Sequence, residues 1–138
     1  MKVVIVSGYF DPLHVGHLEM IKLAKELGDE LVVIVNNDVQ AKIKKGKAFM
    51  REEDRLQIVR AIRYVDAAFI SLDENKTVCK SLKKIRKTHP ENELVFANGG
   101  DRTGGEVPEA KICKKFKIKM VDGLGDKIRS SSELTGIK

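Results

Sequence analysis

Short apolar runs alternate with longer amphipathic stretches along the chain. The first run, residues 3–6, consists of four β-branched or similarly apolar side chains, which is typical of a central parallel strand buried on both faces. The following stretch repeats apolar side chains at helical spacing over 20–27, and Gly28 is placed to end that helix. The continued alternation predicts an α/β fold, a Rossmann-like doubly wound five-stranded parallel sheet in three α/β/α layers. The expected strands are 3–6, 31–35, 67–70, 94–97 and 117–121; the expected helices are 17–27, 52–63, 77–87, a short helix after Pro108 and a terminal helix from Ser130, with a lysine-containing loop over 36–50.

Length and composition narrow the class of protein. The chain has 138 residues, 42% hydrophobic and 33% charged, which suits one folded domain over residues 1–138 rather than a disordered chain. No apolar run approaches the roughly 20 residues of a membrane span, and the first strand begins directly, so we expect no membrane partner and no targeting segment. Cys79 and Cys113 are too few for a disulfide framework. We therefore expect a cytoplasmic protein with free thiols.

The formal net charge of +6 raises the question of a nucleic-acid partner. Basic residues gather in three runs, 42–47, 80–87 and 114–119. The second run falls on the outer side of a helix with an apolar inner side, and the third flanks a strand. Aromatic side chains for base stacking are scarce, with five Phe and two Tyr. The last two runs fit solvated faces better, and we expect no nucleic-acid partner.

The segment G-Y-F-D-P-L-H-V-G-H, residues 8–17, joins the first expected strand to the first helix. His14 and His17 are three residues apart, so both imidazoles can turn toward one point at the helix start, where Gly16 leaves the backbone bare. Free backbone N–H groups at a helix start, together with imidazoles, are suited to an anion, and we expect a polyphosphate. Two other interpretations stay open: one histidine caps the helix, or Asp11 and both histidines bind zinc.

Further polar clusters follow the second, fourth and fifth expected strands, at 36–38, 98–105 and 123–130. The carboxyl ends of parallel strands meet at one edge of a sheet, which is where open α/β sheets bind their ligands. This convergence predicts an active site at that edge, whatever the family.

The motif over 8–17 resembles the H-x-G-H signature of the cytidylyltransferase-like nucleotidyltransferases. That superfamily includes glycerol-3-phosphate and choline-phosphate cytidylyltransferases, heptose-phosphate adenylyltransferases and pantetheine-phosphate adenylyltransferase. Residues 24–33 (A-K-E-L-G-D-E-L-V-V) and 55–66 are similar to blocks of glycerol-3-phosphate cytidylyltransferases, at the same distances from the motif. The resemblance is close over 1–66 and thins beyond.

The resemblance implies a nucleotidylyltransferase that moves CMP or AMP from CTP or ATP to a small phosphorylated alcohol or sugar and releases pyrophosphate. It also implies Mg²⁺ as the companion of the triphosphate, held mostly by phosphates and water, and a homodimer. Arg102 stands where the cytidylyltransferases have tryptophan, and the G-G-D segment leans toward the heptose-phosphate adenylyltransferases. A nucleotide-binding module without catalysis is the other alternative.

The family's roles carry over residue by residue. Its histidines stabilise the α-phosphoryl group in the transition state. Its two lysines after the second strand match Lys44 and position 46, which is glycine here, so Lys47 (or Lys45) would supply the second cation from a flexible loop. An idle solvated loop is the alternative.

A serine-rich segment near the carboxyl end, residues 130–132, matches the family segment that holds the β- and γ-phosphates. Ser130 and Glu133 form a capping box, so a helix is expected to start there. The family arginine aligns with Gly125, so Lys127 or Arg129 would supply the cation.

The predicted site residues fall into three groups. The catalytic residues are His14, His17, Lys44, Lys47 and Arg129. The nucleotide-binding residues are Gly8, Tyr9, Phe10, Asp11, Gly16, Asn98, Gly100, Asp101, Lys127, Ser130, Ser131 and Ser132. The acceptor-binding residues are Asp38, Arg55 and Arg63, where surface ion pairing is the alternative for the two arginines, which we expect close to the same helix face. No residue is predicted as a metal ligand, although Asp11 could touch Mg²⁺.

Overall fold

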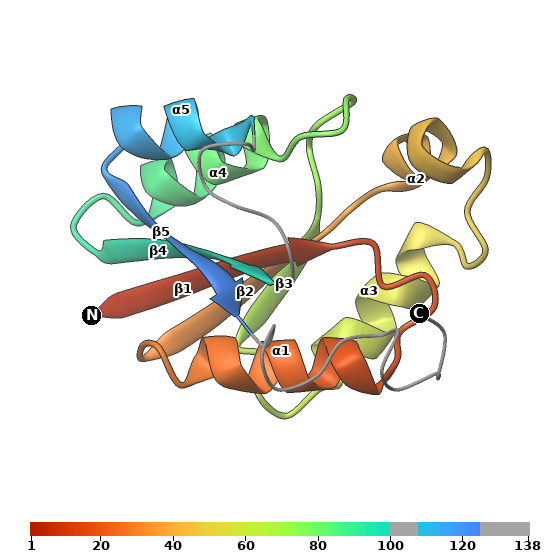
Figure 1. Cartoon of the computed structure of the whole chain (residues 1–138), viewed down its shortest axis with the longest axis horizontal. Coiled ribbons are helices and arrows are strands. Elements are labelled where there is room, and N and C mark those ends of the chain that lie inside the picture. The colour runs from red at the N-terminus through yellow and green to blue at the C-terminus, as the bar shows by residue number, and fades with distance from the viewer. Residues whose placement is uncertain (100–107, 125–138) are drawn as a thin grey trace.

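The computed structural model describes residues 1–99 and 108–124. Within them, five parallel strands form one sheet in the order β3-β2-β1-β4-β5 (Figure 1). The strands are β1 (Lys2–Gly8), β2 (Glu30–Val35), β3 (Ala67–Ile70), β4 (Glu93–Gly99) and β5 (Ile118–Leu124), and the helices are α1 (Val15–Lys25), α2 (Asp38–Lys45), α3 (Glu52–Arg60), α4 (Cys79–Thr88) and α5 (Glu109–Lys115). The chain winds from central β1 to one edge and then to the other, so the predicted doubly wound fold is confirmed.

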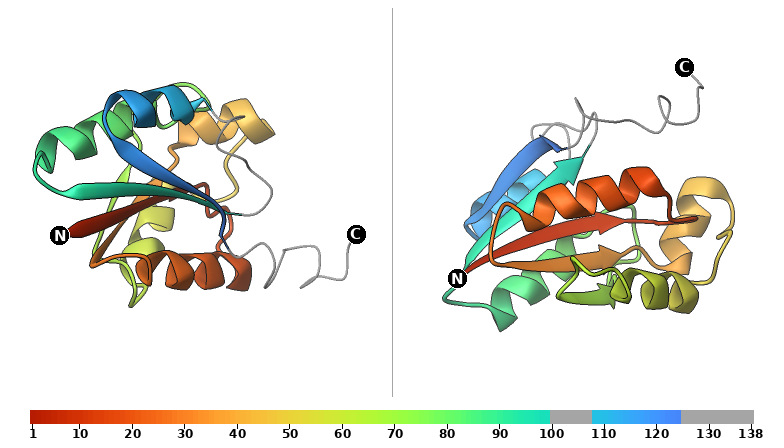
Figure 2. Two further views of the ribbon diagram at one scale, coloured as in Figure 1. Left: turned by 60° about the vertical axis from the view of Figure 1, so that its left-hand side comes forward. Right: turned by 90° about the horizontal axis from the view of Figure 1, so that it is seen from below.

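The central strand explains why the sheet is covered on both faces. Val3, Val4, Ile5 and Val6 are all fully buried, and Ile5 lies between Val32 on β2 and Phe96 on β4. Helices α1 and α3 cover one face and α4 and α5 the other, as Figure 2 shows. The two cores are separate clusters, one on each face, because side chains of a strand alternate between them.

The segment after β2 corrects the prediction of a flexible loop over 36–50. It contains α2, whose N-terminus is fixed by a capping box: the Asn37 side chain accepts from the Gln40 amide, and the Gln40 side chain accepts from the Asn37 amide. The helix ends at Gly46, which has a φ of 88°, a left-handed conformation that favours glycine. These capping signals are readable in the sequence, but the helix between them has only eight residues, four of them lysines or an aspartate, so it resembles a polar loop.

Helix α2 is also attached to the sheet. The Asn37 side-chain amide donates to the carbonyls of Ser71 (3.0 Å) and Asp73 (2.7 Å), just beyond β3. The buried Gln40 side chain donates to the carbonyls of Asn75 and Thr77. The lysines at the end of α2 are therefore carried by an anchored helix beyond the carboxyl edge of the sheet (Figure 1).

Two of the helix boundaries that differ from the prediction affect predicted site residues. Helix α1 begins at Val15 rather than His17, because His14 is its N-cap. Helix α3 ends at Arg60, so Arg63 is not on the same helix face as Arg55. The lysines of α4 and those flanking β5 are exposed, as predicted. None of the helices in the described ranges is long and apolar enough to cross a membrane.

Candidate active site

The two motif histidines form a pair at the start of α1. The His14 imidazole Nδ1 accepts from the Gly16 amide, and the His17 Nδ1 accepts from the His14 amide, both at 3.1 Å. The ring centroids are 3.9 Å apart. A nitrogen that accepts a hydrogen bond carries no proton, so in each neutral ring the hydrogen lies on Nε2. Backbone amides thus orient two Nε2–H donors, an arrangement suited to phosphoryl oxygens.

This geometry joins two interpretations that the sequence left separate, since His14 is a helix cap and the same cap orients its ring. The Gly16 amide donates to the His14 ring, so it is not free to donate to a phosphate. The predicted approach of a nucleotide phosphate to the bare backbone at Gly16 stays a prediction.

The buried ring of Phe10 packs against the His17 imidazole. Phe10 is 1% exposed, and its ring meets the His17 ring edge to face at a centroid distance of 5.1 Å. Gly8 lies against the same ring: a Cβ at Gly8 would be 2.8 Å from Phe10 Cζ. The structure therefore places Gly8 and Phe10 in the packing that positions His17. The Phe10 ring is too buried for the predicted contact with a nucleotide, whereas the contact of Gly8 stays a prediction.

The surroundings of His17 keep its imidazole neutral. Burial lowers its pKa from 6.5 to about 4, and electrostatic interaction with His14 and Lys45 acts in the same direction. At neutral pH the His17 imidazole is therefore uncharged, with its hydrogen on Nε2.

We expect an NMR titration to place the pKa of His17 near 4. Lys45→Met should raise that pKa, because it removes a positive charge that disfavours the imidazolium, whereas Lys47→Met serves as the control. Since the folded-state pKa lies below 6.5, the unfolded chain binds more protons between these values, and the free energy of unfolding should fall as the pH is lowered from 6.5 toward 4. A His17 pKa that stays at 6.5 would contradict this account of its environment.

Asp11 joins the motif to the segment after α2. Its carboxylate accepts from the amides of Phe49 (2.7 Å) and Met50 (2.6 Å) and pairs with Lys45 at 3.2 Å. Burial would raise the pKa of Asp11, but the two amides and Lys45 outweigh it and hold the pKa below 3.8. The carboxylate is thus committed to the protein, which does not fit the expected contact with nucleotide or Mg²⁺.

The burial and the hydrogen bonds of Arg55 could not be predicted from the sequence. Its side chain is buried, and its guanidinium donates to the carbonyls of Tyr9 (2.7 Å), Asn36 (2.6 Å) and Met50 (2.9 Å) and to the Asp38 carboxylate (2.8 Å). It therefore joins the motif, the end of β2 and the segment before α3. The structure corrects the prediction of an accessible arginine: Arg55 is a positioning residue for the loops around the site.

The remaining predicted residues near α2 are placed as follows. Lys44 Nζ lies 4.4 Å from the centroid of the Tyr9 ring, above the motif. Lys45 also donates to the Asp11 carbonyl at 2.9 Å, so it is this lysine, rather than Lys47, that the structure brings to the histidines. Lys47 is exposed beyond Gly46. The Asp38 side chain is 40% exposed while paired with Arg55.

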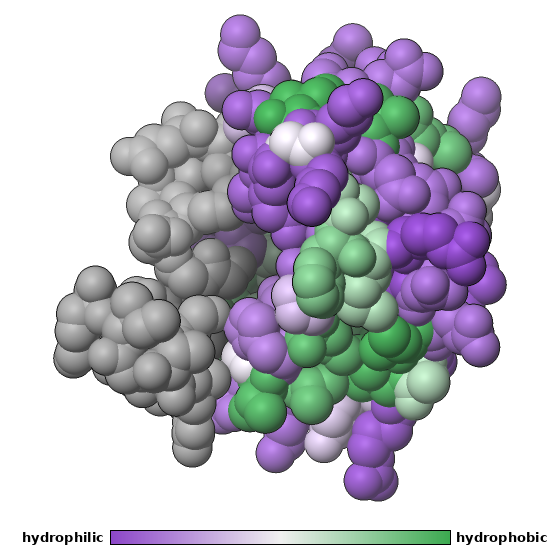
Figure 3. Space-filling view, turned by 90° about the vertical axis from the view of Figure 1, so that its right-hand side faces the viewer, coloured by the Kyte–Doolittle hydropathy of each residue, from purple (hydrophilic) through white to green (hydrophobic). Residues whose placement is uncertain are grey.

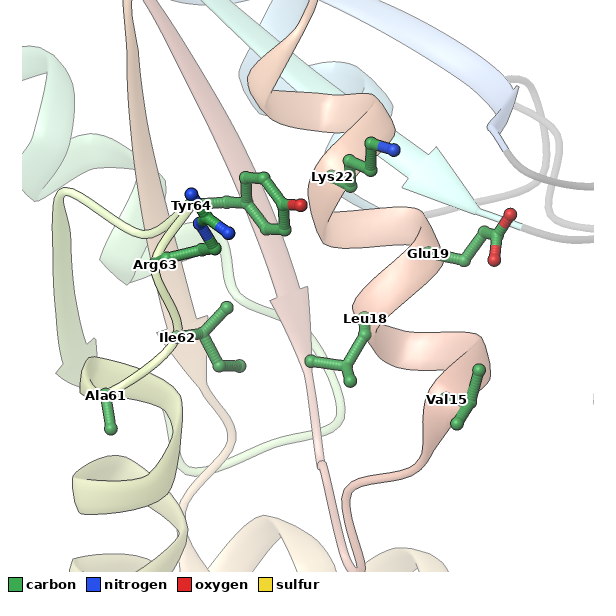
Figure 4. Close-up of a pocket in the computed structure, with 8 residues that line it drawn as sticks. All are labelled: Val15, Leu18, Glu19, Lys22, Ala61, Ile62, Arg63 and Tyr64. Atoms are coloured by element: carbon green, nitrogen blue, oxygen red, sulfur yellow. The ribbon is translucent and has the colours of Figure 1, made fainter.

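Arg63 belongs to a different region from Arg55. It lines a cavity of about 460 Å³ between α1 and residues 61–64, with its guanidinium carbon 5.8 Å from the centroid of the Tyr64 ring. Figure 4 shows Arg63 and Tyr64 facing the α1 side chains across this cavity. Its predicted contact with the acceptor stays a prediction, since the structure does not join Arg63 to the imidazole pair.

On the other side of β1, Asn98 is buried at the end of β4 and its side-chain amide donates to Asp122 Oδ1 at 3.0 Å. Seven predicted residues lie outside the described ranges: Gly100, Asp101, Lys127, Arg129, Ser130, Ser131 and Ser132. Their roles stay predictions.

The zinc interpretation is not supported by the arrangement of its three residues. The Asp11 carboxylate faces two amides and Lys45, and each histidine Nδ1 accepts from the backbone. Over residues 1–99 and 108–124, no three or more His, Cys, Asp or Glu side chains are grouped as a metal site.

Comparisons with known proteins show the family to which the chain belongs. A family model described as cytidylyltransferase-like matches residues 5–122. The FAD synthase of Pyrococcus abyssi is 47% identical over 100 residues, which are 72% of this chain and 63% of that protein. The bifunctional protein HldE of Streptomyces coelicolor is 36% identical over 118 residues, 83% of this chain and 23% of HldE. The chain thus spans less than two thirds of the curated relatives it matches.

A solved structure gives the same result for the fold. The lipopolysaccharide core biosynthesis protein from Thermoplasma volcanium superposes with a TM-score of 0.71 at 28% identity, over 88% of this chain and 95% of that one.

Proposed function

Because the chain belongs to the cytidylyltransferase-like family, we propose that it transfers a nucleotidyl group, AMP rather than CMP, from a nucleoside triphosphate to a phosphorylated small molecule. The observation that carries this proposal is the imidazole pair, with both Nδ1 atoms engaged by backbone amides at the carboxyl end of β1. The choice of ATP is supported by the relatives named FAD synthase and HldE and by the absence of tryptophan from the chain.

In the proposed reaction an oxygen of the acceptor phosphate attacks the α-phosphorus of ATP. A new P–O bond forms, the bond between the α-phosphorus and its bridging oxygen breaks, and pyrophosphate leaves. Negative charge grows on the oxygens around the α-phosphorus, and the Nε2–H groups of His14 and His17 would donate to them. Lys44 and Lys45, carried by α2, would add positive charge beside the motif. No nucleophilic side chain is required.

Mg²⁺ would neutralise the triphosphate and draw charge toward the leaving pyrophosphate. The phosphates and water would supply most of its ligands, because the carboxylate of Asp11 already accepts from two amides and pairs with Lys45. The homodimer implied by the family resemblance remains part of the proposal.

The proposal is tested by pyrophosphate release from ATP, CTP, GTP and UTP, each with FMN, glycerol 3-phosphate and a hexose 1-phosphate as acceptors. We expect release with ATP and a phosphorylated acceptor and a lower kcat/KM with CTP. Preference for CTP would overturn the choice of nucleotide. Binding of ATP without release for any acceptor would favour the catalytically silent module.

A further inference from the structure

Helices α4 and α5 lie side by side on the face of the sheet opposite α1 and α3 (Figure 2). Their inner sides pack Leu82, Ile85 and Cys113 into the core. Their outer sides carry all the lysines of the two helices at helical spacing, and every one is exposed. We call this surface the lysine face; it consists of Lys80, Lys83, Lys84 and Lys87 on α4 and Lys111, Lys114 and Lys115 on α5. In the sequence these lysines belong to two separate basic runs, and the fold brings them together on one surface.

The positive charge of the protein is concentrated on the lysine face. Together α4 and α5 contain seven lysines, Arg86 and one carboxylate, that of Glu109, a net charge of +7, whereas the whole chain has a net charge of +6. Glu109 is buried and its carboxylate accepts from the Val78 amide. Over residues 1–99 and 108–124, none of the seven lysines forms an ion pair with a carboxylate. Lysines four residues apart, such as Lys80 and Lys84, repel each other, so this surface is stabilised when an array of anions covers it.

The guanidinium of Arg86 fixes α4 against the end of α5. It donates to the carbonyls of Phe116 (3.0 Å) and Lys117 (3.1 Å), which follow α5, and to those of His89 (3.2 Å) and Asn92 (2.9 Å). Arg86 is therefore engaged by the backbone, and no arginine of α4 or α5 is left to read a base edge or to hold a phosphate with two hydrogen bonds. The lysine face thus offers ammonium groups on two helices that are fixed relative to each other.

We propose that the lysine face binds the phosphate backbone of a double-stranded nucleic acid without regard to its base sequence. Each lysine that meets a phosphate releases counterions, which favours binding. Packed helices lie about 8–10 Å apart, and the major groove of DNA is about 12 Å wide, so the lysines of the two helices can contact phosphates on both sides of one groove. The expectation of no nucleic-acid partner considered each basic run by itself, and the proposal replaces it.

The other side chains of the lysine face favour a duplex over other polyanions. No large apolar side chain of α4 or α5 is exposed, whereas apolar surface is visible on the side of the molecule that carries α2 (Figure 3). Helices that bind to a lipid surface insert apolar side chains into it. Single strands are bound by aromatic rings that stack on bases, and the ring nearest to this face, that of Phe116, is partly buried with Lys115 Nζ 5.7 Å from its centroid. Lysines alone suit the regular phosphate rows of a duplex.

This inference does not depend on the proposed function. The imidazole pair lies at the start of α1, and α1 covers the face of the sheet opposite the lysine face. A duplex on α4 and α5 therefore leaves the start of α1 uncovered. We expect pyrophosphate release to be unchanged when lysines of this face are replaced.

The test measures the Kd of the full chain for a short duplex RNA, a duplex DNA of the same sequence and each single strand, by fluorescence anisotropy over a range of salt concentrations. The test variant is Lys83→Gln with Lys114→Gln; the matched control is Lys22→Gln with Lys42→Gln, which removes the same charge from exposed positions of α1 and α2. Each lost phosphate contact removes about 0.9 from the slope of log K against log salt, so the test variant should lower the slope by about 2 and raise Kd by roughly 50-fold at about 0.1 M salt. The control should stay close to the parent, and all three proteins should unfold at the same urea concentration, because the replaced side chains are exposed.

Steeply salt-dependent binding of duplex RNA, duplex DNA or both, lost in the test variant only, would support the proposal, and the two duplexes show which nucleic acid is preferred. Equal losses in the test and control variants would mean that net charge rather than the lysine face attracts the duplex, and would overturn it. Tighter binding of a single strand, or no duplex binding at low salt, would overturn it as well. Vesicles of phosphatidylserine and phosphatidylcholine serve as a further probe, and binding to them without binding to either duplex would assign the face to a lipid surface instead.

Discussion

His17→Ala is expected to lower kcat by roughly 10²- to 10³-fold, the scale of losing one preorganised donor to a developing phosphoryl charge. The expectation follows from the tautomer: the His14 amide occupies Nδ1, so the hydrogen lies on Nε2, and burial keeps the ring neutral. Steady-state pyrophosphate release with ATP and the best acceptor is the measurement. KM for ATP should change less than kcat, because the donor acts mainly on charge that develops in the transition state.

A second variant separates donation from helix capping. His17→Asn keeps a side-chain oxygen near the position of Nδ1, where it can accept from the His14 amide, but it has no group at Nε2. We expect it to resemble the parent in urea unfolding and His17→Ala in kcat. His89→Ala is the matched control, since His89 caps the far end of α4. A kcat of His17→Ala equal to that of the control would remove the imidazole pair from the reaction.

Arg55→Lys is expected to lower the free energy of unfolding by about 3 kcal/mol, because breaking a buried, hydrogen-bonded charge leaves its partners without compensation. The three carbonyls of Tyr9, Asn36 and Met50 come from separate segments, and an ammonium cannot reach all of them together with Asp38. Urea unfolding measures the loss. Activity should fall as well, since the motif and the segment carrying Phe49 lose a shared support.

Arg51→Lys supplies the comparison for this loss. Arg51 pairs with Asp54 at 3.6 Å, and its side chain is 77% exposed. Such surface pairs contribute about 0–1 kcal/mol, so its unfolding should barely change. Equal stability losses in the two variants would mean that the Arg55 contacts contribute no more than a surface ion pair.

Two segments that resemble the family show what could be inferred from the sequence and what required the structure. The sequence was enough to match residues 24–33 and 55–66 to a family. It did not show what these residues do in the fold. In the structure the Asp66 carboxylate accepts from the Leu31 amide at 2.8 Å and pairs with Lys25. These blocks are therefore bound to each other, and Asp66 holds the first turn of the chain into β2.

The sequence by itself determined the order of the five strands and of α1, α3, α4 and α5, the burial of β1 on both faces and the position of the motif at the carboxyl edge. These features follow from the periodicity of apolar and polar side chains, which is a local property of the sequence. Helix α2 could also have been predicted from the sequence, because Asn37 and Gln40 form its N-terminal capping box and Gly46 is its C-cap.

Only the tertiary structure decided the contacts of Arg55 and Asp11. A charged residue in a polar helix is normally solvated, and nothing near Arg55 in the sequence shows that carbonyls from three distant segments surround it. The hydrogen bonds of Asp11 likewise join it to the amides of Phe49 and Met50, which lie 38 and 39 positions further along the chain. Long-range hydrogen bonds leave no local pattern, so the sequence could place the site but not the contacts that hold it.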